Sequence, residues 1–407
     1  MDSIVTLLKN NRWFLFLSIS FLLSGIGTSF TQVLVFGQLI DLKATDSEIA
    51  LNFVLVTLAN IISLYFGAKI SYKFKPFTIF LFCEILSITS LVIPLYAITH
   101  QNIFLLNVTT LVPGICSGLT FIAYTTLIKN SFTESDYESI SIIESLLFAG
   151  VILIGTGVGL VVYKFLSPYE FIYFDAILSV IVIFVFLLIK SIRPSEPLAN
   201  DQEKTSTYAL KNLRGEKLQT FLLPLILYIT TAPAMSLLPT IGKKFNDIHL
   251  MFGLILSSGV ALIFARGIGQ ILGPIVLGKI GITDKVKNIN TIIYLFIGFI
   301  SLYSLVFLFN NVYVVLFMVV FAHILSNIVF AVSIYMMYAC FSETEIVYYS
   351  TKSYQLGNFI LLIVSLLCVY FVQYFSVFST YLMISAISFT SLLYVKYSNS
   401  LKLKPQR

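Results

Sequence analysis

Five ionisable side chains within long apolar runs are the residues of this chain that could do chemistry. Apolar runs of about 20 residues have the length of a membrane-spanning helix. A charged group facing lipid is costly, so such a side chain normally faces a cavity or a charged partner. The five residues are Glu84, Glu144, Asp175, Arg266 and His323.

Arg266 and an acidic group at the same depth predict a charge pair that breaks and forms as the protein changes conformation. Counting from the ends of their runs at about 1.5 Å per residue places Glu84, Glu144 and Arg266 in the inner part of the membrane. A static salt bridge that locks helices together explains the same residues equally well. For Glu144, which lies close to the interface, simple solvation by water is the favoured interpretation.

Asp175 and His323 are candidates for proton binding. Asp175 lies two turns from the outer end of its run, where it could take a proton from outside or bond a neighbouring group such as Tyr173. His323 lies at mid-depth near Asn327. A single His among apolar residues is more often a hydrogen-bonded packing residue than a relay.

Aromatic and amide side chains in the same runs could line a cavity for a small molecule. Such pockets are mostly apolar, with a few polar groups that orient the ligand. Packing against lipid or neighbouring helices explains most of the aromatic residues as well. The candidates are Gln32, Phe36, Asn60, Tyr124, Tyr228, Asn327, Tyr335 and Asn358.

Three closely spaced glycines, Gly155, Gly157 and Gly159, predict close helix contact. Glycine removes the side chain from a helix face and lets another helix approach. No motif indicates an enzyme, a metal site or a bound cofactor. The chain lacks a phosphate-binding loop, and its three histidines are widely scattered.

The elements that must position these residues are twelve predicted membrane helices. The chain has 407 residues, of which 58% are hydrophobic and 11% charged, whereas soluble domains carry roughly 25% charged residues. We therefore expect an all-α membrane protein. The predicted spans are 13–36, 49–68, 77–98, 103–127, 139–163, 168–190, 218–241, 249–278, 289–309, 312–339, 350–372 and 375–396.

The positive charges predict the orientation of these spans. Twenty of the 25 Lys and Arg residues fall on the side of the N-terminus, four on the other side, and Arg266 lies within a span. Lys and Arg are enriched in cytoplasmic loops. We therefore expect both termini in the cytoplasm and a location in a bacterial inner membrane.

The polar stretch Ser191–Lys217 divides the chain into two six-helix bundles, 1–190 and 218–407. It predicts a cytoplasmic linker, 191–217, that lets the halves move relative to each other. Its last part, Tyr208–Lys217, could form an amphipathic surface helix with Leu210 and Leu213 toward lipid. A flexible linker is the alternative.

The layout and several segments resemble the major facilitator superfamily. The first span (KNNRWFLFLSISFLLSGIGTSF), the start of the second half (PLILYITTAPAMSLLPTI) and the segment around Arg266 (ARGIGQILGPIVLGK) are similar to its drug-efflux branch, including macrolide-efflux proteins. Thr28 follows Gly27, where such exporters commonly carry an acidic residue.

This resemblance implies a monomeric transporter that rocks two halves around a central site. We expect export of an amphipathic small molecule, such as an antibiotic, a drug or a peptide-like toxin, by proton antiport. Uptake or facilitated movement of a nutrient or metabolite is the alternative. The expected partners are the small molecule, protons and the bilayer, without nucleic acid.

Overall fold

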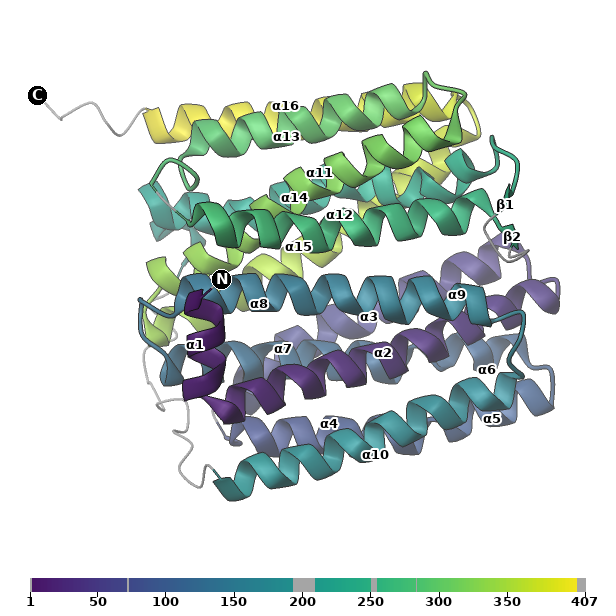
Figure 1. Ribbon diagram of the computed structural model, residues 1–407, viewed down its shortest axis with the longest axis horizontal. Coiled ribbons are helices and arrows are strands. Elements are labelled where there is room, and N and C mark those ends of the chain that lie inside the picture. Colours follow the sequence, from purple (N-terminus) through teal and green to yellow (C-terminus); the bar gives the residue numbers. More distant parts are fainter. Residues whose placement is uncertain (1, 72, 193–208, 250–254, 283, 401–407) are drawn as a thin grey trace, which may run out of the picture.

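The computed structural model describes residues 2–71, 73–192, 209–249, 255–282 and 284–400, and nearly all of them are helical (Figure 1). Within these residues, twelve helical segments are long and apolar enough to cross a membrane, which confirms the predicted all-α membrane fold. In a bilayer, a helix satisfies every backbone hydrogen bond within its own segment, which favours this architecture.

The first half of the chain contains six spans, three of which are built from more than one helix. Its elements are α1 (Asp2–Asn10), α2 (Arg12–Asp41), α3 (Asp46–Ser71), α4 (Pro76–Ser90), α5 (Val92–Thr99), α6 (Ile103–Val108), α7 (Leu111–Ser131), α8 (Tyr137–Gly150), the π-helix η1 (Val151–Val158), α9 (Gly159–Val162) and α10 (Pro168–Ile192).

The second half contributes the other six spans. Its elements are the 3₁₀ turn η3 (Leu210–Asn212), α11 (Gly215–Gly242), β1 (Ile248–His249), β2 (Ile255–Leu256), α12 (Ser258–Ile280), α13 (Ile289–Val306), α14 (Val312–Cys340), α15 (Glu343–Val372) and α16 (Val377–Ser400).

Prolines explain two of the helix interruptions. A proline removes the hydrogen bond to the carbonyl four residues earlier and clashes with it. Pro94 lies four residues after Ser90, where α4 ends, and Pro113 lies four residues after Thr109, the cap of α6. The third interruption, η1, coincides with the glycine-rich segment, and single π-turns in helices are frequently found at functional sites.

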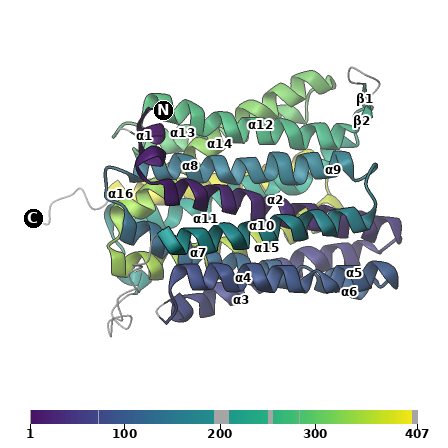
Figure 2. The same cartoon turned by 60° about the horizontal axis from the view of Figure 1, so that its bottom comes forward.

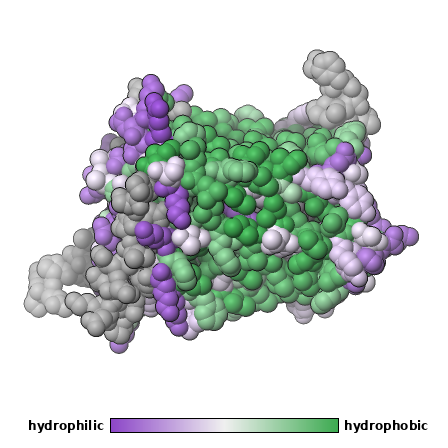
Figure 3. Space-filling model, turned by 90° about the horizontal axis from the view of Figure 1, so that it is seen from below, coloured by the Kyte–Doolittle hydropathy of each residue, from purple (hydrophilic) through white to green (hydrophobic). Residues whose placement is uncertain are grey.

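On the face seen in Figure 3, an apolar belt separates two polar ends. We name the end that holds α1 the basic face, because the lysine-rich connections α3–α4 and α12–α13 lie there (Figure 1). The other end is the opposite face. The helices of the two halves lie side by side with their axes roughly parallel (Figures 1 and 2).

The eighth span differs from the prediction of 249–278. Helix α12 begins only at Ser258, capped by Ser257, and before it the two short strands β1 and β2 pair antiparallel, with Ile248 opposite Leu256. Hydropathy alone does not distinguish a short apolar strand from the start of a helix. The correction places Arg266 about 12 Å from the helix start, toward the opposite face rather than at inner depth.

The end of the linker also differs from the prediction. Residues 193–208 lie outside the described part of the chain, and Leu210–Asn212 forms one 3₁₀ turn instead of an amphipathic helix. Leu213 is only 3% exposed and packs in the main core rather than toward lipid. Gly215, with φ +54°, permits the sharp change of direction into α11.

Candidate functional site

A cavity of about 450 Å³ lies between the two halves at mid-depth. Aromatic and apolar side chains form most of its wall, with a few amides and hydroxyls. Four predicted residues line it, namely Tyr228, His323, Asn327 and Asn358. The other lining residues are Phe121, Phe148, Pro224, Leu227, Thr231, Met235, Gln270, Ser326, Phe330, Tyr354 and Leu361.

The sequence reasoning missed Gln270 and Tyr354, although both lie in predicted spans. Gln270 is 4% exposed, and its side-chain oxygen has no hydrogen-bond partner among the described residues. The Asn327 amide donates to the backbone oxygen of Gln270. Asn358 donates to the Tyr354 carbonyl at 2.9 Å. Gln270 could have been predicted from the sequence, because it lies four residues after Arg266 and residues at this spacing share a helix face.

Helices α12 and α14 approach closely beside this cavity. A Cβ at Gly273 would lie 2.8 Å from the Ile324 carbonyl oxygen, which is closer than real Cβ atoms come. Glycine is therefore required where α12 crosses α14, and the contact holds Gln270 against Asn327.

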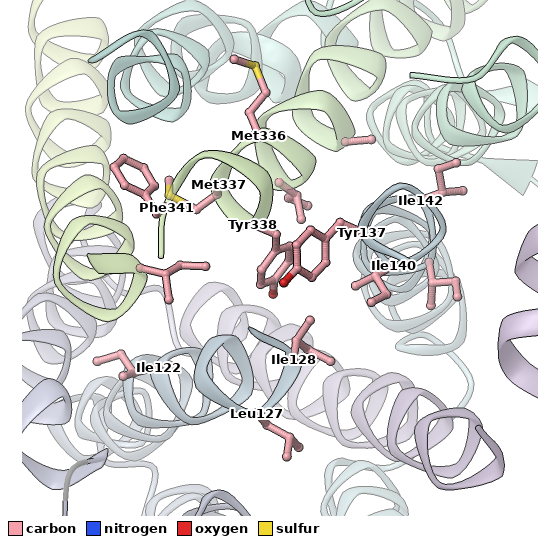
Figure 4. Packing of buried hydrophobic residues seen from close by; sticks show 14 of the residues in the cluster. Ile122, Leu127, Ile128, Tyr137, Ile140, Ile142, Met336, Met337, Tyr338 and Phe341 are labelled. Atoms are coloured by element: carbon pink, nitrogen blue, oxygen red, sulfur yellow. The ribbon is translucent and has the colours of Figure 1, made fainter. Parts of the chain in front are cut away.

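Contacts between the halves close the cavity toward the basic face. Lys129 donates to the Tyr338 carbonyl at 2.6 Å, and the Tyr338 hydroxyl donates to Glu144 at 2.9 Å. Tyr137 of α8 and Tyr338 of α14 lie side by side among apolar residues of α7 and α8 (Figure 4). The space on this side, next to Glu144 and Ser350, shrinks to about 20 Å³.

Glu144 therefore lies at a contact between the halves, and its carboxylate is bonded rather than simply solvated. Tyr124, a predicted cavity residue, lies beside Glu144. The sequence could not reveal the partner Tyr338, which is 194 residues away.

Glu84 and Asp175 both lie inside the first half against α2, bonded to hydroxyl groups seven residues apart on that helix. Ser24 donates to Glu84, and Thr31 donates to Asp175 at 2.5 Å. The two acids are 7% and 6% exposed, and Asp175 is close enough for its charge to act on Glu84. Neither acid forms an ion pair in the described part of the chain.

Arg266 is not brought together with either Glu84 or Glu144 in this conformation. It lies in the second half, where its charge acts on Tyr303 and His323. The Tyr303 hydroxyl and His323 Nε2 lie 2.6 Å apart, so His323 is hydrogen-bonded as well as facing the cavity. Acidic and basic intramembrane groups are thus divided between the two halves.

The remaining predicted cavity residues lie elsewhere. Gln32 and Phe36 are exposed on one face of α2, and Asn60 donates to the Ser117 hydroxyl at 3.1 Å. Tyr335 lies near Lys287, toward the basic face. None of these four lines the cavity, because each lies on another face or at another depth of its helix.

The predicted glycines contact two different partners. A Cβ at Gly155 would lie 2.6 Å from Ser29 Cβ, and one at Gly159 would lie 3.3 Å from Val33, so both face α2 of the same half. Gly157 faces Phe264 of the other half at 3.4 Å. A tighter contact between the halves is at Gly267, where a Cβ would lie 2.9 Å from Leu153.

A sequence profile described as Major Facilitator Superfamily matches residues 13–344. The fold and the central cavity define a membrane transporter of this architecture. The chain belongs to the Major Facilitator Superfamily and is a secondary transporter. Such proteins bind small-molecule substrates, often with proton coupling, work as monomers and are generally not enzymes.

Solved structures share the fold at low sequence identity. A bacterial homologue of the iron transporter ferroportin, in an outward-facing state, has a TM-score of 0.68 and 11% identity, covering 94% of this chain and 97% of that one. The fucose:proton symporter FucP of E. coli has a TM-score of 0.66 and 13% identity, covering 95% and 98%. The human organic anion transporter TETRAN has a TM-score of 0.65 and 11% identity, covering 94% and 99%.

One curated relative matches over a short segment. It is an uncharacterised 29.9 kDa protein from the crtE 3′ region of Pseudescherichia vulneris, 32% identical over 69 residues. The match covers 17% of this chain and about a quarter (25%) of that protein.

Proposed function

We propose that this transporter exports an amphipathic small molecule through the cavity between its halves. The supporting observation is the cavity itself, which measures about 450 Å³ and has mostly apolar and aromatic walls with a few polar groups. A site of this make-up suits a ligand with a large apolar surface and a small polar part.

The proposed mechanism is alternating access between the halves 1–190 and 218–407. The basic face is the cytoplasmic side of a bacterial inner membrane, because positively charged loops remain there. In the conformation described, Tyr338 and Glu144 close that side. Separation of α8 from α14 would break this hydrogen bond and open the cavity to the cytoplasm.

Proton binding at Glu84 and Asp175 supplies the energy in this proposal. Acids in an apolar interior that have no cationic partner in the described part of the chain are stabilised when a proton neutralises them. The hydroxyl groups of Ser24 and Thr31 bond to the acids in the conformation described. Both acids lie against α2, whose other neighbours include η1 at Gly155, so a change in protonation can alter the packing of the first half.

The test compares accumulation of amphipathic fluorescent compounds in cells with and without this chain. We expect lower accumulation in cells that make the protein, and loss of that difference when an uncoupler collapses the proton gradient. The Glu84→Gln variant, at equal membrane abundance, should behave like cells lacking the protein.

Two results would contradict export by proton antiport. Higher accumulation in the presence of the protein would support uptake, the alternative. A lowered accumulation that persists with the uncoupler would show that the proton gradient is not the energy source.

A further inference from the structure

Arg266 is a cationic side chain at membrane depth without an anionic partner in the described ranges of the chain. The two ion pairs found there, Lys217–Glu345 and Lys287–Asp284, both lie at the basic face. The nitrogen Nε of Arg266 is buried and has no hydrogen-bond partner among the residues that the structure describes. An unpaired charge is costly inside a membrane protein, which makes such a residue a candidate for binding a ligand.

The position of Arg266 is beside the central cavity. It lies one turn before Gln270, and residues four apart share a helix face. Its charge reaches His323, and both Gln270 and His323 line the cavity. Side chains of a helix lean toward its N-terminus. Arg266 is not itself among the residues that line the cavity, but it adjoins two that are, and its side chain leans toward the opposite face.

Gln270 provides a second, independent indication of a ligand at this point. Its side-chain oxygen is buried without a partner, and the residue is 4% exposed. The two ends of an amide group are assigned by hydrogen bonding rather than observed, so the same position can present an N–H donor. A buried amide oxygen of Gln270 and the buried Nε of Arg266, both without partners among the described residues, thus belong to side chains one helical turn apart.

We propose that Arg266 and Gln270 bind an anionic group, such as a carboxylate, of the transported molecule. This inference rests on the proposed transport through the cavity and adds the chemical class of the substrate. Guanidinium groups bind carboxylates through two parallel hydrogen bonds, which combine charge with directional recognition. The ligand anion takes the place of a counter-ion that the described residues do not supply.

The rest of the cavity indicates an aromatic body attached to this anion. Phe121 of the first half contacts Tyr354 of the second with ring centroids 3.9 Å apart, and Phe148 likewise contacts Phe330 at 5.2 Å. These four rings line the cavity. An aromatic organic anion would stack on rings from both halves, whereas a bare inorganic ion would leave most of this apolar space unfilled.

The test measures equilibrium binding of radiolabelled 2-naphthoate and of its neutral analogue 2-naphthamide to the full chain in lipid nanodiscs. We expect the wild type to prefer naphthoate by roughly ten- to hundredfold, the range for a charge-assisted hydrogen bond. Arg266→Gln should reduce this preference to about one. Arg12→Gln, which removes the same charge at the exposed start of α2, should retain it.

The ratio of naphthoate binding to naphthamide binding within one variant separates an effect on recognition from an effect on folding. If Arg266→Gln also abolishes naphthamide binding, the Arg266→Lys variant provides the test. Lysine keeps the charge without the paired donors, so this variant should show an intermediate preference for naphthoate. Equal binding of both compounds to the wild type, or a preference unchanged in the variants, overturns the proposal. Displacement of naphthoate by equimolar chloride or inorganic phosphate also overturns it, because the site would then be an inorganic-anion site.

Failure of this inference and failure of the proposed function are distinguishable. Binding in nanodiscs requires no gradient and no transport direction. Arg266-dependent naphthoate binding without export from cells overturns the proposed function alone. Export without any preference for the carboxylate overturns the inference alone.

Discussion

The hydrogen bond between Tyr338 and Glu144 offers the sharpest test of closure at the basic face. Tyr338→Phe removes only the hydroxyl that donates to Glu144 at 2.9 Å. The backbone contact from Lys129 and the ring contact with Tyr137, whose centroid lies 5.5 Å away, are retained. The variant therefore isolates one bond across the two halves.

The expected effect follows from the strength of that bond. A hydrogen bond to a neutral group contributes about 1 kcal/mol and one to a charged group up to about 3 kcal/mol. Since the bond forms only when the basic face is closed, its loss shifts the equilibrium between closed and open states by roughly five- to hundredfold toward open.

The assay is labelling of a single cysteine introduced at Ser350. This residue is 1% exposed and lies beside Glu144 and Tyr338, and its hydroxyl has no partner in the described structure. In a chain lacking the four native cysteines, a membrane-impermeant maleimide added at the basic face should label Ser350→Cys slowly. Tyr338→Phe should raise the labelling rate by at least fivefold.

A matched control lies one turn away on the same helix. Tyr335 makes no side-chain hydrogen bond within the described residues, so Tyr335→Phe should leave labelling unchanged. Glu144→Gln should act in the same direction as Tyr338→Phe, and the double variant should add little, because the two residues share one interaction. Equal labelling of wild type and Tyr338→Phe would refute the assignment of this bond to closure.

Three further predictions concern coupling and packing. Glu84→Gln should abolish the response of transport to a proton gradient, while substrate binding in nanodiscs remains within about twofold of wild type. The substitution removes proton exchange without touching the cavity. A retained gradient response would exclude Glu84 as a proton-coupling residue. Gly267→Ala should lower transport, and it should lower the free energy of unfolding by about 1–3 kcal/mol through overpacking against Leu153. Gly157→Ala should be tolerated, because its new Cβ meets the Phe264 ring at an ordinary 3.4 Å. Equal effects of the two variants in a melting assay would contradict this difference. Gly157→Phe should nevertheless abolish transport while protein remains in the membrane, and unchanged transport would show that the contact between halves is not needed.

The amino-acid sequence determined the twelve helices of this protein and the separation of its positive charges to one end. Both follow from local physics: a bilayer requires about 20 apolar residues per helix, and cytoplasmic loops are enriched in Lys and Arg. The same local rule misplaced the start of α12, because Ile248 and Leu256 are as apolar in a hairpin as in a helix. The predicted start at 249 therefore placed Arg266 too far from the opposite face.

Only the tertiary structure decided which polar groups meet. Glu84 bonds Ser24 across 60 residues and Glu144 bonds Tyr338 across 194, and no periodicity within a helix encodes such pairs. The sequence marked the costly residues, since an ionisable group in an apolar run is visible at once. Packing then placed Glu84 and Asp175 against α2 in one half and left Arg266, in the other half, without an acid among the described residues, because each helix can turn only one face toward the cavity.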